Sequence, residues 1–114
     1  MATRATITIK RAEDVYDNLW YIHSDGYLSV LGREIFENLR SVNDIERASV
    51  IFKNNDCLST LETSCVLGEV VSMGEILTQF NDYSYVFDEE TEKWSYYMFD
   101  KHDQHDLGEG LSLL

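Results

Sequence analysis

The stretch YSYVFDEETEKWSYYMF, residues 83–99, decides the fold. Two runs rich in aromatic residues, 83–87 and 94–99, flank six polar residues, which is the pattern of two strands joined by a turn. This segment therefore predicts a β-hairpin near the end of the chain. Its tip carries four acidic residues, Asp88, Glu89, Glu90 and Glu92.

A second hairpin is predicted at the start of the chain. Residues 5–10, ATITIK, alternate small or apolar residues with polar ones, as a strand with one buried face does. Residues 19–23, LWYIH, are rich in aromatic and branched side chains and should pair back on that first strand. The second run ends at Ser24, Asp25 and Gly26, residue types that favour a turn with a positive φ at the glycine.

Between the two hairpins the spacing of apolar residues becomes helical. One apolar stripe comprises Leu28, Leu31, Ile35 and Leu39. A second stripe runs over residues 45–53 behind Asn43, which resembles a helix cap, and Ser72 with Glu75 has the spacing of a capping box before a short third helix. Residues 56–68 fit a helix or a strand and stay undecided.

These elements predict an α+β fold. We expect an antiparallel sheet built from an N-terminal and a C-terminal hairpin, with two or three helices between them packed on one face. The 114 residues, 44% of them apolar and none of them proline, show no linker, so we expect a single domain over 1–114. Residues 100–114 are predicted to form a partly ordered acidic tail.

The composition also bears on the cellular compartment. No apolar run approaches the roughly 20 residues that cross a bilayer, and residues 1–6 lack the apolar stretch of an export signal, which predicts a cytoplasmic protein without membrane contact. Cys57 and Cys65 match no metal or redox spacing and are interpreted as packed thiols. No cofactor is expected.

The negative charge is concentrated in the second half of the chain. The net charge is −12, and residues 54–114 hold thirteen acidic residues against two basic ones, Lys93 and Lys101. Such a field repels nucleic-acid phosphates and speeds encounter with basic protein surfaces. Direct nucleic-acid binding is therefore not expected, and a basic protein or nucleoprotein is the predicted partner. The alternative is that the acidity only maintains solubility.

The acidic hairpin is the first candidate site. Because we do not expect both faces of its sheet to be core, some of its aromatic residues must be exposed, and aromatic side chains amid carboxylates are typical of a protein-binding face. The predicted partner-binding residues are Asp88, Glu89, Glu90 and Glu92, with the exposed members of Tyr83, Tyr85, Trp94 and Tyr96 as anchors.

Two further stretches are weaker candidates. His23, Asp25 and Tyr27, with Arg4 or Arg33, could bind a small ligand such as a nucleotide signal, or could serve only the turn. His102 and His105 would share one face of a helix and could bind a metal, although an acidic run of this kind is more often solvated.

No enzyme class is indicated. None of the six glycines falls in a phosphate-binding pattern, and no local Ser/His/Asp or Cys/His set is apparent. The chain is therefore predicted not to be an enzyme.

Three stretches together resemble a known family. They are RATITI at 4–9, YIHSDGY at 21–27 with Gly32 after it, and YSYVF at 83–87. The family comprises small, largely uncharacterised bacteriophage and prophage proteins with an N-terminal RATI-type strand and a His-x-Asp-Gly-Tyr turn. Leu28 stands where that family usually has proline. The resemblance implies a mobile-element origin and, for so acidic a chain, an anti-defence role.

The leading hypothesis combines the charge with that resemblance. We expect an anti-CRISPR-like inhibitor whose carboxylates mimic phosphates and occupy a basic, nucleic-acid-binding surface of a host defence protein in the host cytoplasm. Two alternatives stay open: a protein that binds or sequesters a nucleotide signal, and a metal-binding domain or metal-dependent enzyme. The sequence also leaves a homodimer open.

Overall fold

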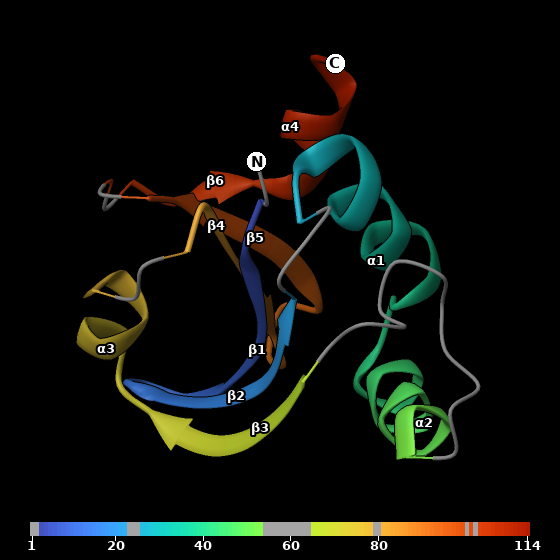
Figure 1. Cartoon of the computed structure of the whole chain (residues 1–114), viewed down its shortest axis with the longest axis vertical. Helices are drawn as coiled ribbons and strands as arrows, with labels where there is room; N and C mark the ends of the chain where they lie inside the picture. The colour runs from blue at the N-terminus through green and yellow to red at the C-terminus, as the bar shows by residue number, and fades with distance from the viewer. Residues whose placement is uncertain (1–2, 23–25, 54–64, 79–80, 100, 102) are drawn as a thin grey trace.

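The computed structural model describes residues 3–22, 26–53, 65–78, 81–99, 101 and 103–114 (Figure 1). Six strands of this part form one sheet in the order β3-β2-β1-β4-β5-β6. The strands are β1 (Ala5–Ala12), β2 (Val15–Ile22), β3 (Cys65–Val71), β4 (Tyr83–Asp88), β5 (Lys93–Met98) and β6 (His105–Asp106). The helices are η1 (Leu28–Gly32), α1 (Arg33–Asn38), α2 (Val42–Lys53), α3 (Met73–Thr78) and α4 (Leu107–Ser112). The α+β class predicted from the sequence is confirmed.

Both predicted hairpins are present. β1 pairs antiparallel with β2, and β4 pairs antiparallel with β5, with Tyr85 opposite Tyr96 and Phe87 opposite Trp94. The rings of Phe87 and Trp94 meet edge to face at 5.2 Å between centroids, a geometry that stabilises cross-strand aromatic pairs.

The predicted sheet is mostly antiparallel, but the two hairpins join through one parallel pair of strands, which the sequence did not predict. β1 runs parallel to β4, from Ala5 opposite Tyr83 to Lys10 opposite Asp88. Parallel neighbours need a long connection that returns the chain to the same end of the sheet. The helices and β3 between β2 and β4 supply that connection.

The stretch left undecided by the sequence contains an edge strand. Its described part, from Cys65 onward, belongs to β3, which pairs antiparallel with β2. Residues 56–64, and with them Cys57, lie outside the described residues, as does the side chain of Cys65.

The predicted helices form with shifted boundaries. The stripe from Leu28 to Leu39 folds as the π-helical turn η1 followed by α1. α2 begins one residue before Asn43, and its cap is Ser41, whose Oγ accepts a hydrogen bond of 3.2 Å from the backbone N–H of Asp44. No helix in the described part of the chain is long and apolar enough to cross a membrane.

The helix cap predicted at Ser72, at the start of α3, is confirmed. The Oγ of Ser72 accepts a 3.3 Å hydrogen bond from the backbone N–H of Glu75 and donates one of 3.4 Å to that residue's Oε1.

Helices cover both faces of the sheet. On one face, Ile7, Trp20 and Phe87 pack with Ile35 of α1 and with residues of α2 and α4. On the other face, a smaller apolar cluster packs under α3 and comprises Tyr16, Val71, Ile76, Val86 and Tyr97. Figure 1 shows α3 on the opposite side of the sheet from α1 and α2. The prediction of helices on a single face therefore fails for α3.

A β-bulge in β2 allows this strand to contribute side chains to the apolar clusters on both faces of the sheet. Thr8 lies opposite Asn18 and Ile7 lies opposite Trp20, which leaves Leu19 as the extra residue between them. Because side chains alternate along a strand, the extra residue turns Asn18 and Trp20 to opposite faces.

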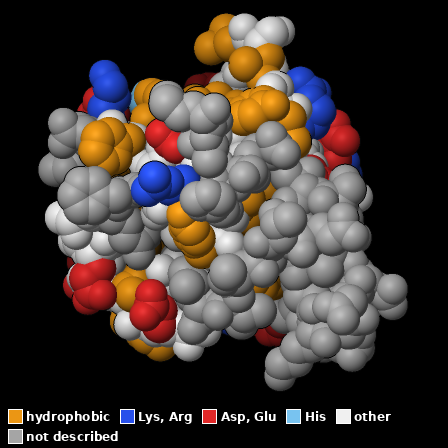
Figure 2. Space-filling model, in the orientation of Figure 1, with side chains coloured by type: hydrophobic (Ala, Val, Ile, Leu, Met, Phe, Trp, Pro, Cys, Tyr) orange, Lys and Arg blue, Asp and Glu red, His pale blue; other side chains and the backbone are white. Residues whose placement is uncertain are grey.

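The end of the chain is part of the fold. Residues 105–112, predicted within a partly ordered tail, form β6 and α4, and Leu107 is fully buried. The Oδ1 of Asp106 caps α4 by accepting a 3.0 Å hydrogen bond from the backbone N–H of Glu109. At the last turn of the chain Leu113 and Leu114 are exposed, and Figure 2 shows hydrophobic side chains gathered there.

Candidate functional site

The turns of the two hairpins lie side by side at one edge of the sheet. The parallel register continues past the strand ends, since the backbone N–H of Glu89 donates a 3.1 Å hydrogen bond to the carbonyl of Lys10. We call the six carboxylates carried by these turns the acidic edge: Glu13, Asp14, Asp88, Glu89, Glu90 and Glu92. A hollow of about 330 Å³ lies between the turns, lined by Lys10, Arg11, Ala12, Glu13, Asp88 and Glu90.

Basic side chains of β1 neutralise the inner part of this edge. Lys10 Nζ lies 3.9 Å from Asp88 Oδ2, and Arg11 Nη1 lies 3.5 Å from Glu89 Oε1. Arg11 Nε also donates a 2.6 Å hydrogen bond to Asp17, which, together with the neighbouring carboxylate charges, raises the pKa of the guanidinium. Asp88 and Glu89 thus offer a partner less charge than the sequence alone predicts.

Asp88 and a further carboxylate of the edge, Asp14, also accept hydrogen bonds from backbone groups. Asp88 Oδ1 accepts hydrogen bonds from the backbone N–H groups of Glu90 and Thr91, and Asp14 Oδ1 accepts one of 2.9 Å from Met73 at the start of α3. Among the described residues, the side chains of Glu13, Glu90 and Glu92 have neither an ion pair nor a hydrogen bond, and all three are exposed. These three carboxylates are the ones available to a partner.

Most of the predicted aromatic anchors lie in the core, so that prediction was wrong for three of the four. Tyr85, Trp94 and Tyr96 are buried, and Tyr83 is partly buried. Burial raises the pKa of the Tyr85 phenol strongly and that of Tyr96 as well. The reason is that both faces of the sheet are covered, so the hairpin does not need to expose one side.

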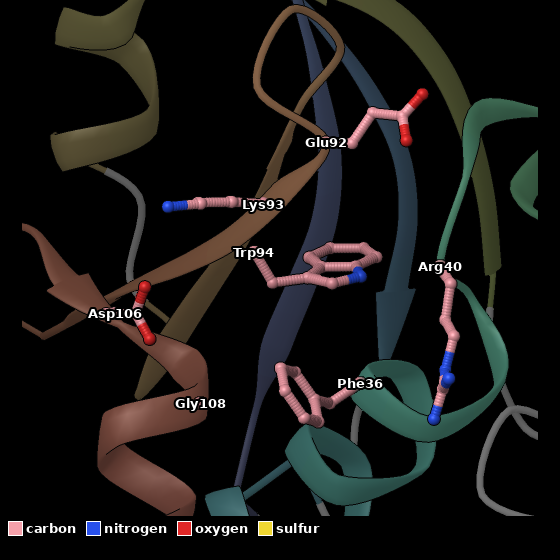
Figure 3. A pocket seen from close by; sticks show the side chains of 7 residues that line it. All are labelled: Phe36, Arg40, Glu92, Lys93, Trp94, Asp106 and Gly108. Atoms are coloured by element: carbon pink, nitrogen blue, oxygen red, sulfur yellow. The ribbon is translucent and has the colours of Figure 1, made fainter.

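The aromatic residue exposed near the acidic tip is Phe36, which the sequence reasoning missed. It is 40% exposed and lines a groove of about 420 Å³ together with Arg40, Glu92, Lys93, Trp94, Asp106 and Gly108 (Figure 3). Trp94 forms the buried floor, because its Nε1 donates a 2.6 Å hydrogen bond to the carbonyl of Leu39. The sequence signal that could have identified Phe36 is its position: it follows Ile35, but it does not belong to the apolar stripe of the predicted helix.

The second candidate stretch is only partly described. His23 and Asp25 lie outside the described residues, so a ligand site using them is neither shown nor contradicted. Arg33 forms a long ion pair of 4.0 Å with Glu37. Tyr27 lies with Tyr83 in a hollow at the end of β4 opposite the acidic edge, so the structure separates Tyr83 from the four acidic residues of the hairpin tip.

A glycine is needed at position 26 because there is no room for a Cβ atom, and not because the backbone there has a positive φ. A Cβ on this residue would lie 2.7 Å from the Cβ of Ala5 and 2.9 Å from the carbonyl oxygen of Thr3. Among the described glycines, a positive φ occurs at Gly68 and not at Gly26, which corrects the predicted turn.

The histidine pair is also described in part. The ring of His105, in β6, stacks on Tyr96 with centroids 5.1 Å apart, whereas His102 lies outside the described residues. Within the described part of the chain, no three His, Cys, Asp or Glu side chains are grouped so that they could hold a metal ion.

Comparison with protein-family models, with curated proteins and with solved structures gives no match for this chain. The features of this chain that bear on function are therefore the acidic edge and the hollows on its surface.

Proposed function

We propose that this chain is a non-enzymatic binding protein whose acidic edge docks on a basic, nucleic-acid-binding surface of a partner protein. The observation that supports this function best is the parallel pairing of β1 with β4, which brings two acidic turns together on one sheet. The paired strands hold the backbones of both turns close together, so the exposed carboxylates on them can stand in for phosphates in a groove rich in lysine and arginine.

The charge of the whole chain supports the same class of partner. A net charge of −12 repels nucleic acid at ordinary ionic strength and accelerates encounter with a basic protein surface. The resemblance to phage proteins makes nucleic-acid-binding host defence proteins, including CRISPR effectors, the first partners to test. Binding there would inhibit the effector by competition with its nucleic acid.

The groove beside Trp94 gives this surface an apolar anchor point. Protein interfaces usually gain most of their energy from a few aromatic or arginine contacts seated in pockets. Phe36 and Glu92 line the same groove, so a partner that contacts the acidic tip also reaches an exposed ring. Because Arg40 and Lys93 line it too, we expect an apolar or uncharged partner side chain there and cationic ones at Glu13 and Glu90.

The test measures binding to a panel of purified CRISPR effector complexes by biolayer interferometry, with and without competing nucleic acid. Glu13→Gln/Glu90→Gln removes two available carboxylates without touching the capping residues Asp14 and Asp88. Asp103→Asn/Glu109→Gln is the matched control, since it removes two exposed charges away from the edge.

We expect nucleic acid to compete with the wild-type chain. We also expect the edge variant to associate about tenfold more slowly at low salt, with the control within about twofold of wild type. Binding by no member of the panel, or equal association of the two variants, would contradict the proposed function.

A further inference from the structure

A second hollow lies at the end of β4 and β5 opposite the acidic edge. It measures about 330 Å³ and is lined by Thr3, Tyr27, Asp82, Tyr83, Met98 and Phe99. Tyr27 is 38% exposed and Phe99 is 50% exposed, so aromatic surface faces solvent at this point of the molecule.

Backbone contacts around this hollow keep its walls in place. The N–H of Gly26 donates a 3.0 Å hydrogen bond to the carbonyl of Thr3, which holds the residue before Tyr27 against the segment that leads into β1. The N–H of Phe99 bonds the carbonyl of Asp82 at 3.0 Å, and the N–H of Arg4 bonds Asp82 Oδ2 at 2.8 Å. The aromatic residues therefore project from a hydrogen-bonded frame that is formed before any ligand arrives.

The side chains of this lining favour a cation. Among the lining residues that the structure describes, Asp82 is the only charged one and none is basic. Tyr83 stacks on Tyr85 with centroids 5.9 Å apart and an interplanar angle of 16°, so one face of its ring is already occupied within the protein. The faces of aromatic rings carry negative potential and attract cations, most effectively those that shed water easily. The net charge of the chain adds to this preference.

A cation that binds here could be a bare ammonium group or an alkylated one, and the lining favours the alkylated one. A bare ammonium group is strongly hydrated, whereas a quaternary ammonium group presents methyl surface to rings and to the thioether of Met98 while it keeps its charge. The hollow is at the small end of ligand sites, which fits a headgroup-sized molecule. We propose that it binds a small quaternary ammonium compound of the choline class, held between Tyr27, Phe99 and Asp82. This site is independent of the acidic edge.

The test compares choline with 3,3-dimethylbutan-1-ol, its neutral isostere, by isothermal titration and by chemical-shift mapping on the wild-type chain. We expect saturable binding of choline and at least about tenfold weaker binding of the neutral isostere, because the rings and the carboxylate act on the charge. Tyr27→Ala and Phe99→Ala should each weaken choline binding about fivefold or more. Phe36→Ala, which removes an exposed ring from the other groove, is the control and should leave it unchanged.

Three results would overturn this site. Equal affinity for the two isosteres would show an apolar hollow without cation recognition. Absence of saturable choline binding would remove the site, and because this comparison uses the wild-type chain, it does not depend on whether a variant folds. A trimethyl-lysine peptide that binds while choline does not would assign the hollow to a protein side chain instead of a small molecule.

Discussion

The phenol hydroxyl of Tyr85, in the centre of the sheet, donates a 2.7 Å hydrogen bond to the carbonyl oxygen of Gly26, 59 residues earlier in the chain. Both groups are buried, and the bond fixes the backbone immediately before Tyr27. A side chain expected on a binding surface thus serves as an internal tie between the C-terminal hairpin and the loop that precedes η1.

Removal of this hydroxyl should destabilise the fold. In Tyr85→Phe the carbonyl of Gly26 loses its buried donor, and we expect the free energy of unfolding to fall by about 1–3 kcal/mol in urea titrations. Tyr83→Phe is the control, because that ring is only partly buried and its hydroxyl has no hydrogen bond among the described residues; its change should stay within about 0.5 kcal/mol. Equal losses in the two variants would contradict the role of the bond.

Stability should also fall at high pH. Burial raises the pKa of Tyr85 in the folded state, while a tyrosine in the unfolded chain titrates near pH 10. The stabilising effect of the neutral phenol is therefore complete below about pH 10 and is lost as pH rises from there toward the folded-state pKa, at up to about 1.4 kcal/mol per pH unit. Urea unfolding between about pH 8 and pH 11 should show a smaller decline for Tyr85→Phe than for wild type; parallel curves would argue against this origin.

Alanine substitutions at Gly26 and Gly74 compare a crowded glycine with an uncrowded one. Gly26→Ala places a methyl group 2.7 Å from the Cβ of Ala5, and we expect a loss of about 1–3 kcal/mol from the resulting shift of the loop. Gly74→Ala, within α3, meets only the Oγ of Ser72 at 3.7 Å and should be neutral or stabilising by up to about 1 kcal/mol. Thermal melts of both variants check the pair, and a harmless Gly26→Ala would show that the loop adapts freely.

The C-terminal helix should behave as core and not as tail. Leu107→Ala removes a fully buried side chain, for which we expect a loss of about 2–5 kcal/mol. Leu113→Ala changes a residue of the same type that is 86% exposed, so its effect should stay within about 0.5 kcal/mol. Chemical denaturation of both variants gives the comparison, and similar small effects would mean that α4 contributes little to stability.

Some residues of the candidate sites could be predicted from the sequence, and others could not. The acidic tip of the second hairpin was predictable, because its carboxylates follow one another in the chain. The contribution of Glu13 to the same edge was not, since it depends on which strands become neighbours. The quaternary ammonium hollow joins Tyr27 to Phe99, which only the register of distant strands brings together.

The sequence by itself determined the features that depend on local pattern: two hairpins from one alternating strand and from runs of aromatic and branched residues beside polar turns, helices from apolar stripes, and the helix cap at Ser72. Tertiary structure alone decided the parallel pairing of β1 with β4, the burial of Tyr85, Trp94 and Tyr96, and the packing of α4. The physical reason is that burial depends on what covers each face of a sheet. Here α3 covers the second face, so the aromatic hairpin with the acidic tip is core along its length and available to a partner only at its ends.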